Sequence, residues 1–415
     1  MKTVTIEHGK DYPTAFIAHL EELKLHLCLF NRATYSRCKA LIEELSKYPN
    51  IKLTLICSSS LLMGDYGKAI DYIRRDHRNC HIETIDEMPQ NPTGTGSAML
   101  VGKLMIALSG YFSTTKPNAV IVVADRFETW APALVARCHN IPIVHIQGGE
   151  ITGNIDDVIR HSITQVADYH FVSTYAAKTY LIEMGQEPKR VYLTGCPSLD
   201  VIARNKIFRR WGKGKYIISI FHPETNLVEK AYEQTKIVME AVIEYCILND
   251  YKCYWYYPNP DPGRMEIVRY LDSVLSEYSK HIVKAINLEP EQFLRQLAQC
   301  RLIIGNSSCG IRESSRLGVP SINVGDRQLL RERSNNVMDV GYDKDKIFRL
   351  LKKQHDMEKY TPSNLYGSGQ STKRMAEYLA RMNYSLKGPL TYPLQAKFKE
   401  QHFGITRFEI NERGR

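Results

Sequence analysis

The residues of this chain with the clearest chemical potential lie in loops that follow short apolar runs. Asp125 and Arg126 come directly after the run AVIVVA, and a carboxylate beside a guanidinium there can act as a catalytic group with an orienting partner. A structural ion pair explains the same two residues. His222 follows another apolar run and can contact a leaving phosphate or shuttle a proton, with a hydrogen-bonded structural histidine as the alternative.

The segment RLIIGNSSCGIRESSRLG, residues 301–318, has the pattern of an anion-binding site. Its apolar residues predict a strand that ends at Ile304, and the turn GNSS is expected to open a helix that ends at Gly318. Ser or Asn caps such a helix, and the free N–H groups at its positive end bind phosphate. Glu313, further along the helix, can accept hydrogen bonds from ribose hydroxyls. A plain N-cap without a ligand is the alternative interpretation.

Three arginines follow the next expected strand, in the stretch GDRQLLRER. Guanidinium groups match the oxygens of a diphosphate, and Arg327 and Arg331, four residues apart, would share one face of a helix. A surface loop held by salt bridges would have the same composition.

A further strand is expected to lead into HIQGGEITGNIDD, where paired glycines permit a close approach to the backbone. Asn154 can cap the helix that follows, and Asp156 and Asp157 are then acids of its first turn, favoured by the helix dipole. Asp156 is expected to face Arg160, and Asp157 to face His161, each four residues on. This structural interpretation explains both acids without any chemistry.

The elements that must position these residues are short strands alternating with amphipathic helices. Several expected strands are apolar on both faces, as in a parallel sheet covered by helices. Helical patterns lie between them at 36–47, 100–112 and 155–166. The expected strands are residues 25–30, 52–57, 119–124, 142–146, 169–172, 191–194, 216–221, 252–257, 281–285, 301–304 and 321–324.

This alternation, repeated on both sides of a linker near 203–214, predicts an α/β fold of two Rossmann-like, doubly wound domains. The expected division is an N-terminal domain at 1–205, a C-terminal domain at 206–385 and a tail or wrapping arm at 386–415. Ligands of such sheets bind beyond the carboxyl ends of the strands, which is where the loops described above lie.

The amino-acid composition is that of an ordinary globular protein. The chain has 415 residues with 43% hydrophobic and 24% charged residues, which are ordinary globular values. We expect neither a membrane span, since no apolar run approaches the required length, nor a signal peptide. The ten cysteines form no CxxC pair, and several lie in apolar runs, which favours reduced thiols and a cytoplasmic location. The histidines lack metal-ligand spacing.

The net charge of +10 is compatible with an anionic small-molecule substrate, and nonspecific contact with nucleic acid or phospholipid is the alternative interpretation. The densest basic stretch is in the expected linker, where a solvated linker and a polyanion contact are the two interpretations. That stretch comprises Arg209, Arg210, Lys213 and Lys215.

Taken together and in this order, the motifs resemble the hydrolysing UDP-N-acetylglucosamine 2-epimerases, especially the epimerase half of the bifunctional sialic-acid enzyme of animals and its bacterial counterparts. The resemblance spans roughly residues 25–385, so we expect only the epimerase portion, without a kinase domain. The matching segments are NRATYS (31–36), DRFE (125–128), HIQGGEITGNIDDVIRHSIT (145–164), GCPSLD (195–200), HPET (222–225), YPNPDPG (257–263), GNSSCGIRE (305–313) and GVPSINVGDRQ (318–328).

The resemblance implies a GT-B arrangement, in which the two domains face each other across a cleft that holds UDP. On matching positions it implies catalytic roles for Asp125, Asp156 and His222, with Gln147 at the position of another catalytic residue. The UDP-binding residues that it implies are Arg32, Ser36, Arg126, Asn259, Leu288, Ser307, Ser308, Glu313 and Arg327.

The reaction that the resemblance implies removes UDP by anti elimination across C1 and C2, giving a glycal, after which water adds and the sugar leaves as its C2 epimer, such as ManNAc. It requires no metal and no cofactor. Carboxylates are needed because a C2 proton is taken on one face and returned on the other. Relatives of this kind form dimers or tetramers, so a homo-oligomer is expected, and the implied pathway is sialic-acid biosynthesis.

The chain departs from the family pattern at several positions. Gln147 stands where a glutamate is expected, and an amide cannot take up or release a proton as a carboxylate does. Thr34 replaces a usual Asp, and Leu330 a usual glycine. Met265 matches a lysine of the animal enzyme's feedback site, so inhibition by CMP-sialic acid is not expected. The alternative function is therefore a GT-B relative with altered chemistry: a glycosyltransferase, or an epimerase for a different UDP-sugar.

Overall fold

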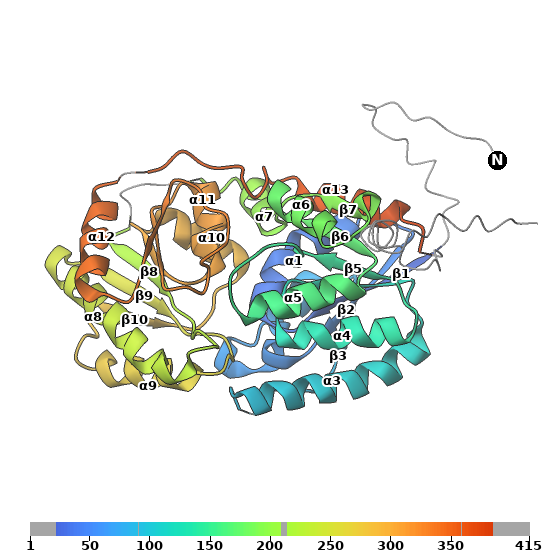
Figure 1. Cartoon of the computed structure of the whole chain (residues 1–415), viewed down its shortest axis with the longest axis horizontal. Coiled ribbons are helices and arrows are strands. Elements are labelled where there is room, and N and C mark those ends of the chain that lie inside the picture. The colour runs from blue at the N-terminus through green and yellow to red at the C-terminus, as the bar shows by residue number, and fades with distance from the viewer. Residues whose placement is uncertain (1–21, 90, 209–213, 358, 385–415) are drawn as a thin grey trace, which may run out of the picture.

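A computed structural model describes residues 22–89, 91–208, 214–357 and 359–384 of the chain. The expected tail at 386–415 and the basic residues Arg209, Arg210 and Lys213 therefore lie outside the described residues. Two separate parallel sheets fill the two halves of the molecule (Figure 1), as the alternation of strands and helices predicts.

The first sheet has seven strands in the order β3-β2-β1-β4-β5-β6-β7, all paired in parallel. Its strands are β1 (Leu23–Leu29), β2 (Ile51–Cys57), β3 (His81–Thr84), β4 (Ala119–Val123), β5 (Ile143–Ile146), β6 (Tyr169–Val172) and β7 (Val191–Leu193). The helices of this half are α1 (Arg32–Leu45), α2 (Ile70–Asp76), α3 (Gly94–Thr115), α4 (Phe127–Cys138), α5 (Ile155–Val166), α6 (Tyr175–Glu183) and α7 (Ser198–Arg204).

The second sheet has six parallel strands in the order β10-β9-β8-β11-β12-β13. Its strands are β8 (Tyr216–Ile220), β9 (Lys252–Tyr256), β10 (Ile282–Ala285), β11 (Ile303–Gly305), β12 (Ser321–Val324) and β13 (Val337–Val340). The later helices are α8 (Ala231–Asn249), α9 (Arg264–Leu275), α10 (Pro290–Gln299), α11 (Glu313–Leu317), α12 (Lys344–Asp356) and α13 (Ser371–Arg381).

The burial of a strand decides whether it can be recognised from the sequence. The inner strands β4, β5, β6 and β12 are buried along their whole length. Strand β4, AVIVV, is an unbroken apolar run, whereas β5 and β6 each contain a buried histidine and β12 contains Ser321 and Asn323. The sequence pattern does not reveal β3 and β13. Both lie at the edge of a sheet and have no fully buried residue, so they lack an apolar run such as that of β4.

Two helices tie the halves together. Helix α13, near the C-terminal end of the described chain, returns to the first half, where Met375, Ala376 and Leu379 join the core between α1 and the first sheet (Figure 1). Helix α7, just before the expected linker, places Leu199 and Ile202 in a core shared with the second sheet. The interface between the halves is therefore a packed core as well as a cleft.

Helix α3 is long and apolar enough to cross a membrane, as judged by length and composition alone. It lies on the outer surface of the first half, and its Leu104 and Leu108 are buried in the core beside α4 (Figure 1). Met99 and Ile106 on its other face are exposed. A helix that covers a sheet meets the same criteria, because one of its faces must be apolar.

Candidate active site

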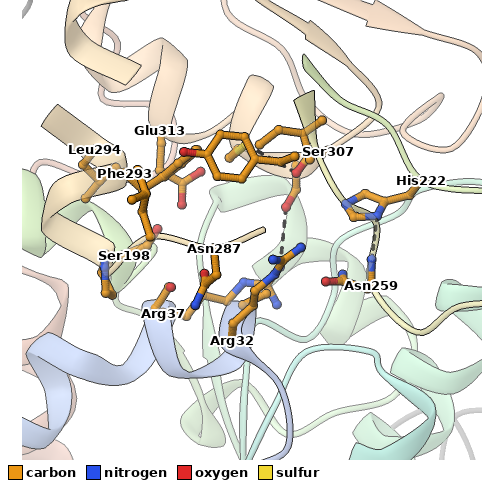
Figure 2. Close-up of a pocket in the computed structure, with 18 of the residues that line it drawn as sticks. Arg32, Arg37, Ser198, His222, Asn259, Asn287, Phe293, Leu294, Ser307 and Glu313 are labelled. Carbon is orange, nitrogen blue, oxygen red and sulfur yellow. Dashed lines mark hydrogen bonds between the residues drawn. The ribbon is translucent and has the colours of Figure 1, made fainter. Parts of the chain in front are cut away.

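A cavity lies between the carboxyl ends of the two sheets and encloses about 1090 Å³ of space, part of it open to solvent. Figure 2 shows Arg32 and Arg37 rising into it from α1, with Phe293, Leu294, Ser307 and Glu313 facing them from the second half. Because parallel strands present their carboxyl ends at one edge, loops far apart in the sequence meet here.

Eleven of the thirteen predicted site residues line this cavity. They are Arg32, Ser36, Asp125, Arg126, His222, Asn259, Leu288, Ser307, Ser308, Glu313 and Arg327. The other two, Asp156 and Gln147, do not line it. Asp156 lies next to a lining residue, since its Oδ2 is 3.6 Å from Nη2 of Arg327. Gln147 is buried and donates from Nε2 to Sγ of Cys196 at 2.9 Å.

Adjacency in the sequence suggested that Asp125 pairs with Arg126, but the structure does not contain this pair. Asp125 accepts hydrogen bonds from Nε and Nη2 of Arg160, a helix α5 residue that is almost completely buried. Burial by itself raises the pKa of Asp125, but the guanidinium groups of Arg160 and Arg37 outweigh it and hold the pKa well below its usual range. Asp125 is therefore ionised at neutral pH.

Arg126 instead reaches across the cleft to Asp261, in the loop after β9. Burial raises the pKa of Asp261, but the charge of Arg126 dominates and lowers it. Because the two residues are 135 positions apart, no local sequence signal could reveal this ion pair. Asp261 was missed as a site residue, although it lies within the predicted motif YPNPDPG.

Asp156 lies in the first turn of α5, capped by Asn154 as predicted. The expected pairs at four-residue spacing are wrong: Arg160 binds Asp125 and Asp157, and Asp156 turns toward Arg327 of the second half. Burial raises the pKa of Asp156 to about 6, Arg327 opposes this effect, and the nearby charge of Asp125 adds to it. The two carboxyl groups therefore titrate far apart, a separation typical of residues with different roles in proton transfer.

The GNSS turn opens a short 3-10 turn, Ser308–Gly310, rather than the single helix to Gly318 that was expected. Helix α11 starts at Glu313, so Glu313 opens the helix rather than lying along it. Gly305 enters the turn with φ of +134°, and an added Cβ would lie 2.1 Å from the carbonyl oxygen of Ile220. Only glycine fits there, and it lets Ser307 and Ser308 face the cavity.

The arginines after β12 occupy a turn rather than a helix, so Arg327 and Arg331 do not share a helix face. Arg327 faces the cavity, whereas Arg331 binds Oε2 of Glu150 together with Nη2 of Arg312, the latter at 2.5 Å. Glu150 is thus a buried link between the two halves. Nη1 of Arg312 also donates to Oε1 of Gln147 at 3.5 Å, so the Gln147 side chain is connected to the ion pairs of Glu150 through Arg312.

His222 is held at one end of the cavity (Figure 2). Its backbone N–H donates to Oδ1 of Asn306 at 2.7 Å, and its Nδ1 accepts from the backbone N–H of Asn259 at 3.4 Å. Burial lowers the pKa of His222 well below its usual value, and Arg327 adds to the effect. The ring is therefore neutral at pH 7, with Nε2 left to contact a ligand.

Several cavity residues were not predicted. Arg37 follows Ser36 on α1, and its Nη2 lies 3.5 Å from Oγ of Ser308, where it adds positive charge to the anion site. A second basic residue on the same helix, directly after the predicted Ser36 and five residues beyond the predicted Arg32, was the signal that could have found it. The other unpredicted lining residues are contributed mainly by α10, β8, β9 and the neighbouring loops, and three of them, Ala33, Ser198 and Cys309, lie within the motifs NRATYS, GCPSLD and GNSSCGIRE. They are Ala33, Ser198, Ile220, Tyr256, Asn287, Pro290, Phe293, Leu294 and Cys309. Among the residues described by the structure, no group of three or more His, Cys, Asp or Glu is placed to hold a metal ion.

Comparison with known proteins agrees with this geometry. The family model described as UDP-N-acetylglucosamine 2-epimerase matches residues 43–380. A UDP-N,N'-diacetylbacillosamine 2-epimerase (hydrolyzing) of Legionella pneumophila is 32% identical, over 84% of this chain and 93% of the relative. A UDP-N-acetylglucosamine 2-epimerase of Neisseria meningitidis is 28% identical, over 86% of this chain and 95% of the relative.

Solved structures share the fold. The UDP-GlcNAc 2-epimerase of Methanocaldococcus jannaschii in complex with UDP-GlcNAc and UDP superposes with a TM-score of 0.70 at 20% identity, covering 87% of this chain and 100% of that one. The enzyme of Neisseria meningitidis bound to UDP-GlcNAc has a TM-score of 0.71 at 18% identity, with the same coverage. The predicted GT-B arrangement of two parallel-sheet domains is thereby confirmed, and the chain belongs to the UDP-N-acetylglucosamine 2-epimerase family of enzymes.

Proposed function

We propose that this protein is a hydrolysing 2-epimerase that converts UDP-GlcNAc and water to UDP and free ManNAc. The observation that carries the proposal is the pair of carboxyl groups with opposite titration, Asp125 and Asp156, beside the cation Arg327. An elimination needs a group that exchanges a proton at C2 and positive charge where the leaving diphosphate gains negative charge.

In the proposed mechanism, Ser307, Ser308 and Arg327 bind the diphosphate, with Arg37 behind them. Asp156, whose pKa is about 6, takes the proton from C2 while the C1–O bond to the β-phosphate breaks and UDP leaves. Asp125 stays ionised and stabilises the positive charge that develops at C1. Water then adds at C1 while a proton returns to the opposite face of C2.

The binding roles of the remaining cavity residues are part of the same proposal. Arg32, Ser36 and Arg126 close over the nucleotide from the first half, while Asn259, Leu288 and Glu313 hold it from the second. Neutral His222 contacts the leaving phosphate from the far end of the cavity. The expected domain boundaries, the homo-oligomer and the cytoplasmic location remain proposals, the last supported by ten free cysteines.

A second candidate is the same reaction on UDP-N,N'-diacetylbacillosamine, favoured by the 32% identical relative that carries this name. Gln147 gives independent reason to test it, since the chain lacks a glutamate expected for the first reaction. The sugars differ at C4 and C6, away from the reacting C1 and C2, so the catalytic proposal is common to both.

Proton NMR of each UDP-sugar with purified protein in deuterated water tests these candidates. The proposal predicts UDP and free ManNAc carrying deuterium at C2, or the corresponding product of the second sugar. If the protein binds UDP but turns over neither sugar, altered chemistry in a GT-B relative is the better description.

A further inference from the structure

The loop before α5 and the turn after β12 touch each other across the cleft, at a point outside the cavity. The amide Nδ2 of Asn154 donates to the backbone carbonyl of Arg327 at 2.7 Å. The backbone N–H of Leu330 donates to the carbonyl of Thr152 at 3.3 Å. We call these contacts of Thr152, Gly153 and Asn154 with Arg327 and Leu330 the cleft latch.

Leu330 supplies the apolar part of the latch. Gly153 has a φ of +90°, and an added Cβ there would lie 3.5 Å from Cγ of Leu330. The leucine side chain therefore lies over a glycine of the opposite half. Its own exposed fraction is 60%, so the contact covers only one side of it.

The first-domain half of the latch is rigid by itself. The carboxylate of Asp157 accepts from the backbone N–H groups of Thr152 at 2.9 Å and Gly153 at 2.7 Å, and from the Thr152 hydroxyl at 2.6 Å. Arg160 pairs with Asp157 at 2.5 Å. The loop thus presents Asn154 in one fixed position.

Asn154 uses both ends of its amide. Oδ1 accepts from the backbone N–H of Asp156 at 2.8 Å and caps α5, while Nδ2 binds the Arg327 backbone. The amide group of Asn154 thereby joins Asp156, the proposed proton acceptor, to Arg327, a proposed ligand of the diphosphate. Serine or threonine would cap the helix but is one bond too short for the bridge, and aspartate has no donor.

We propose that Asn154 is a positioning residue that holds Arg327 against both Asp156 and the bound diphosphate. The inference rests on the proposed function for the role of Asp156, whereas the link to nucleotide binding does not need turnover. Without the bridge the turn after β12 is released, the closed cleft becomes less populated, and the apparent affinity for UDP falls with it.

Loss of the bridge should also change the pKa of Asp156. The charged groups that act on it are Arg327 from the turn after β12, Asp125 from the end of β4, Arg160 from its own helix and Asp261 from the loop after β9. Of these, Arg327 is the group that the latch positions. Moving Arg327 away removes an attraction that favours the ionised carboxylate, so the acid limb of the pH–rate profile should move to higher pH.

The test compares Asn154→Ser with Asp343→Ser, a cap exchange at α12 on the surface of the second half. Calorimetry should show UDP binding weakened about three- to tenfold in Asn154→Ser, the size of one lost hydrogen bond, and unchanged in the control. In an Arg327→Ala background the backbone carbonyl that Asn154 binds is still present, so Asn154→Ser should still weaken UDP binding through the cleft, but it should no longer move the acid limb of the pH–rate profile. UDP affinity and pH profile equal to the wild type would overturn the proposal.

A second variant guards against a folding defect. Leu330→Ala leaves the cap of α5 intact and should weaken UDP binding about twofold by removing part of the apolar contact. If Asn154→Ser does not fold, wild-type affinity in Leu330→Ala would overturn the latch. If the wild type binds UDP but turns over no sugar, the proposed function fails while the affinity measurements still decide the role of Asn154.

Discussion

Glu150 offers the sharpest test of how the two halves are held together. Its carboxylate binds Arg312 at 2.5 Å and also Arg331, both from the opposite half. The exposed fractions of the three side chains are only 3% or 4%, so water does not screen the interaction. Glu150→Gln preserves the shape and one acceptor oxygen but removes the negative charge between two buried guanidinium groups.

We expect this change to destabilise the protein by about 3–5 kcal/mol, the cost of removing one partner of a buried ion pair. Most of this cost arises because the two arginines are left uncompensated in a site of low dielectric constant. Loss of the link should also favour opening of the cleft and weaken UDP binding.

The matched control is Glu289→Gln. Glu289 also joins the two halves, through Arg75 at 2.7 Å, but the exposed fractions of these side chains are 26% and 51%. Solvent screens such a pair, so we expect no measurable change. Urea unfolding followed by circular dichroism measures both variants. If the two substitutions shift the unfolding midpoint equally, burial does not decide the strength of these links and the reasoning is wrong.

Three further predictions concern the reaction. Asp125→Asn should lower kcat about a hundredfold or more in an otherwise folded enzyme, and an unchanged rate would remove Asp125 from the mechanism. Because Asp156 must be ionised to take a proton, kcat/KM should fall as the pH drops below about 6, and a flat profile between pH 5 and 8 would exclude this role. Gln147→Glu should leave kcat for UDP-GlcNAc within about tenfold, since the Gln147 side chain binds Cys196 and Arg312, neither of which has a role in the proposed reaction, whereas a large gain in the NMR assay would indicate that the native protein is specialised for another substrate.

Sequence patterns identify the strands of this fold best where both faces of the strand are buried. Strand β4 is covered on both faces and appears in the sequence as an apolar run, whereas the edge strands β3 and β13 have no fully buried residue and form no such run. Spacing also places most candidate side chains at the carboxyl ends of strands, where the cavity lies. Helix start signals were less reliable: the cap at Asn154 is present, but the GNSS turn leads to a 3-10 turn instead of a helix.

Ion-pair partners that are distant in the chain could not be predicted from the sequence. Asp125 and Arg126 are adjacent in the chain, yet each pairs with a residue elsewhere, Arg160 and Asp261 respectively. The Asp125–Arg160 pair depends on how the first half folds and the Arg126–Asp261 pair on how the two halves meet, and local spacing contains no information about either geometry. For the same reason the role of Glu150 became visible only in the folded chain.

A crystal structure of the protein with UDP-GlcNAc bound tests the central claim most directly. We expect the diphosphate on Ser307, Ser308 and Arg327, with the carboxyl groups of Asp125 and Asp156 within reach of C1 and C2 of the sugar. A nucleotide bound elsewhere, or a sugar that neither carboxyl group can reach, would contradict it.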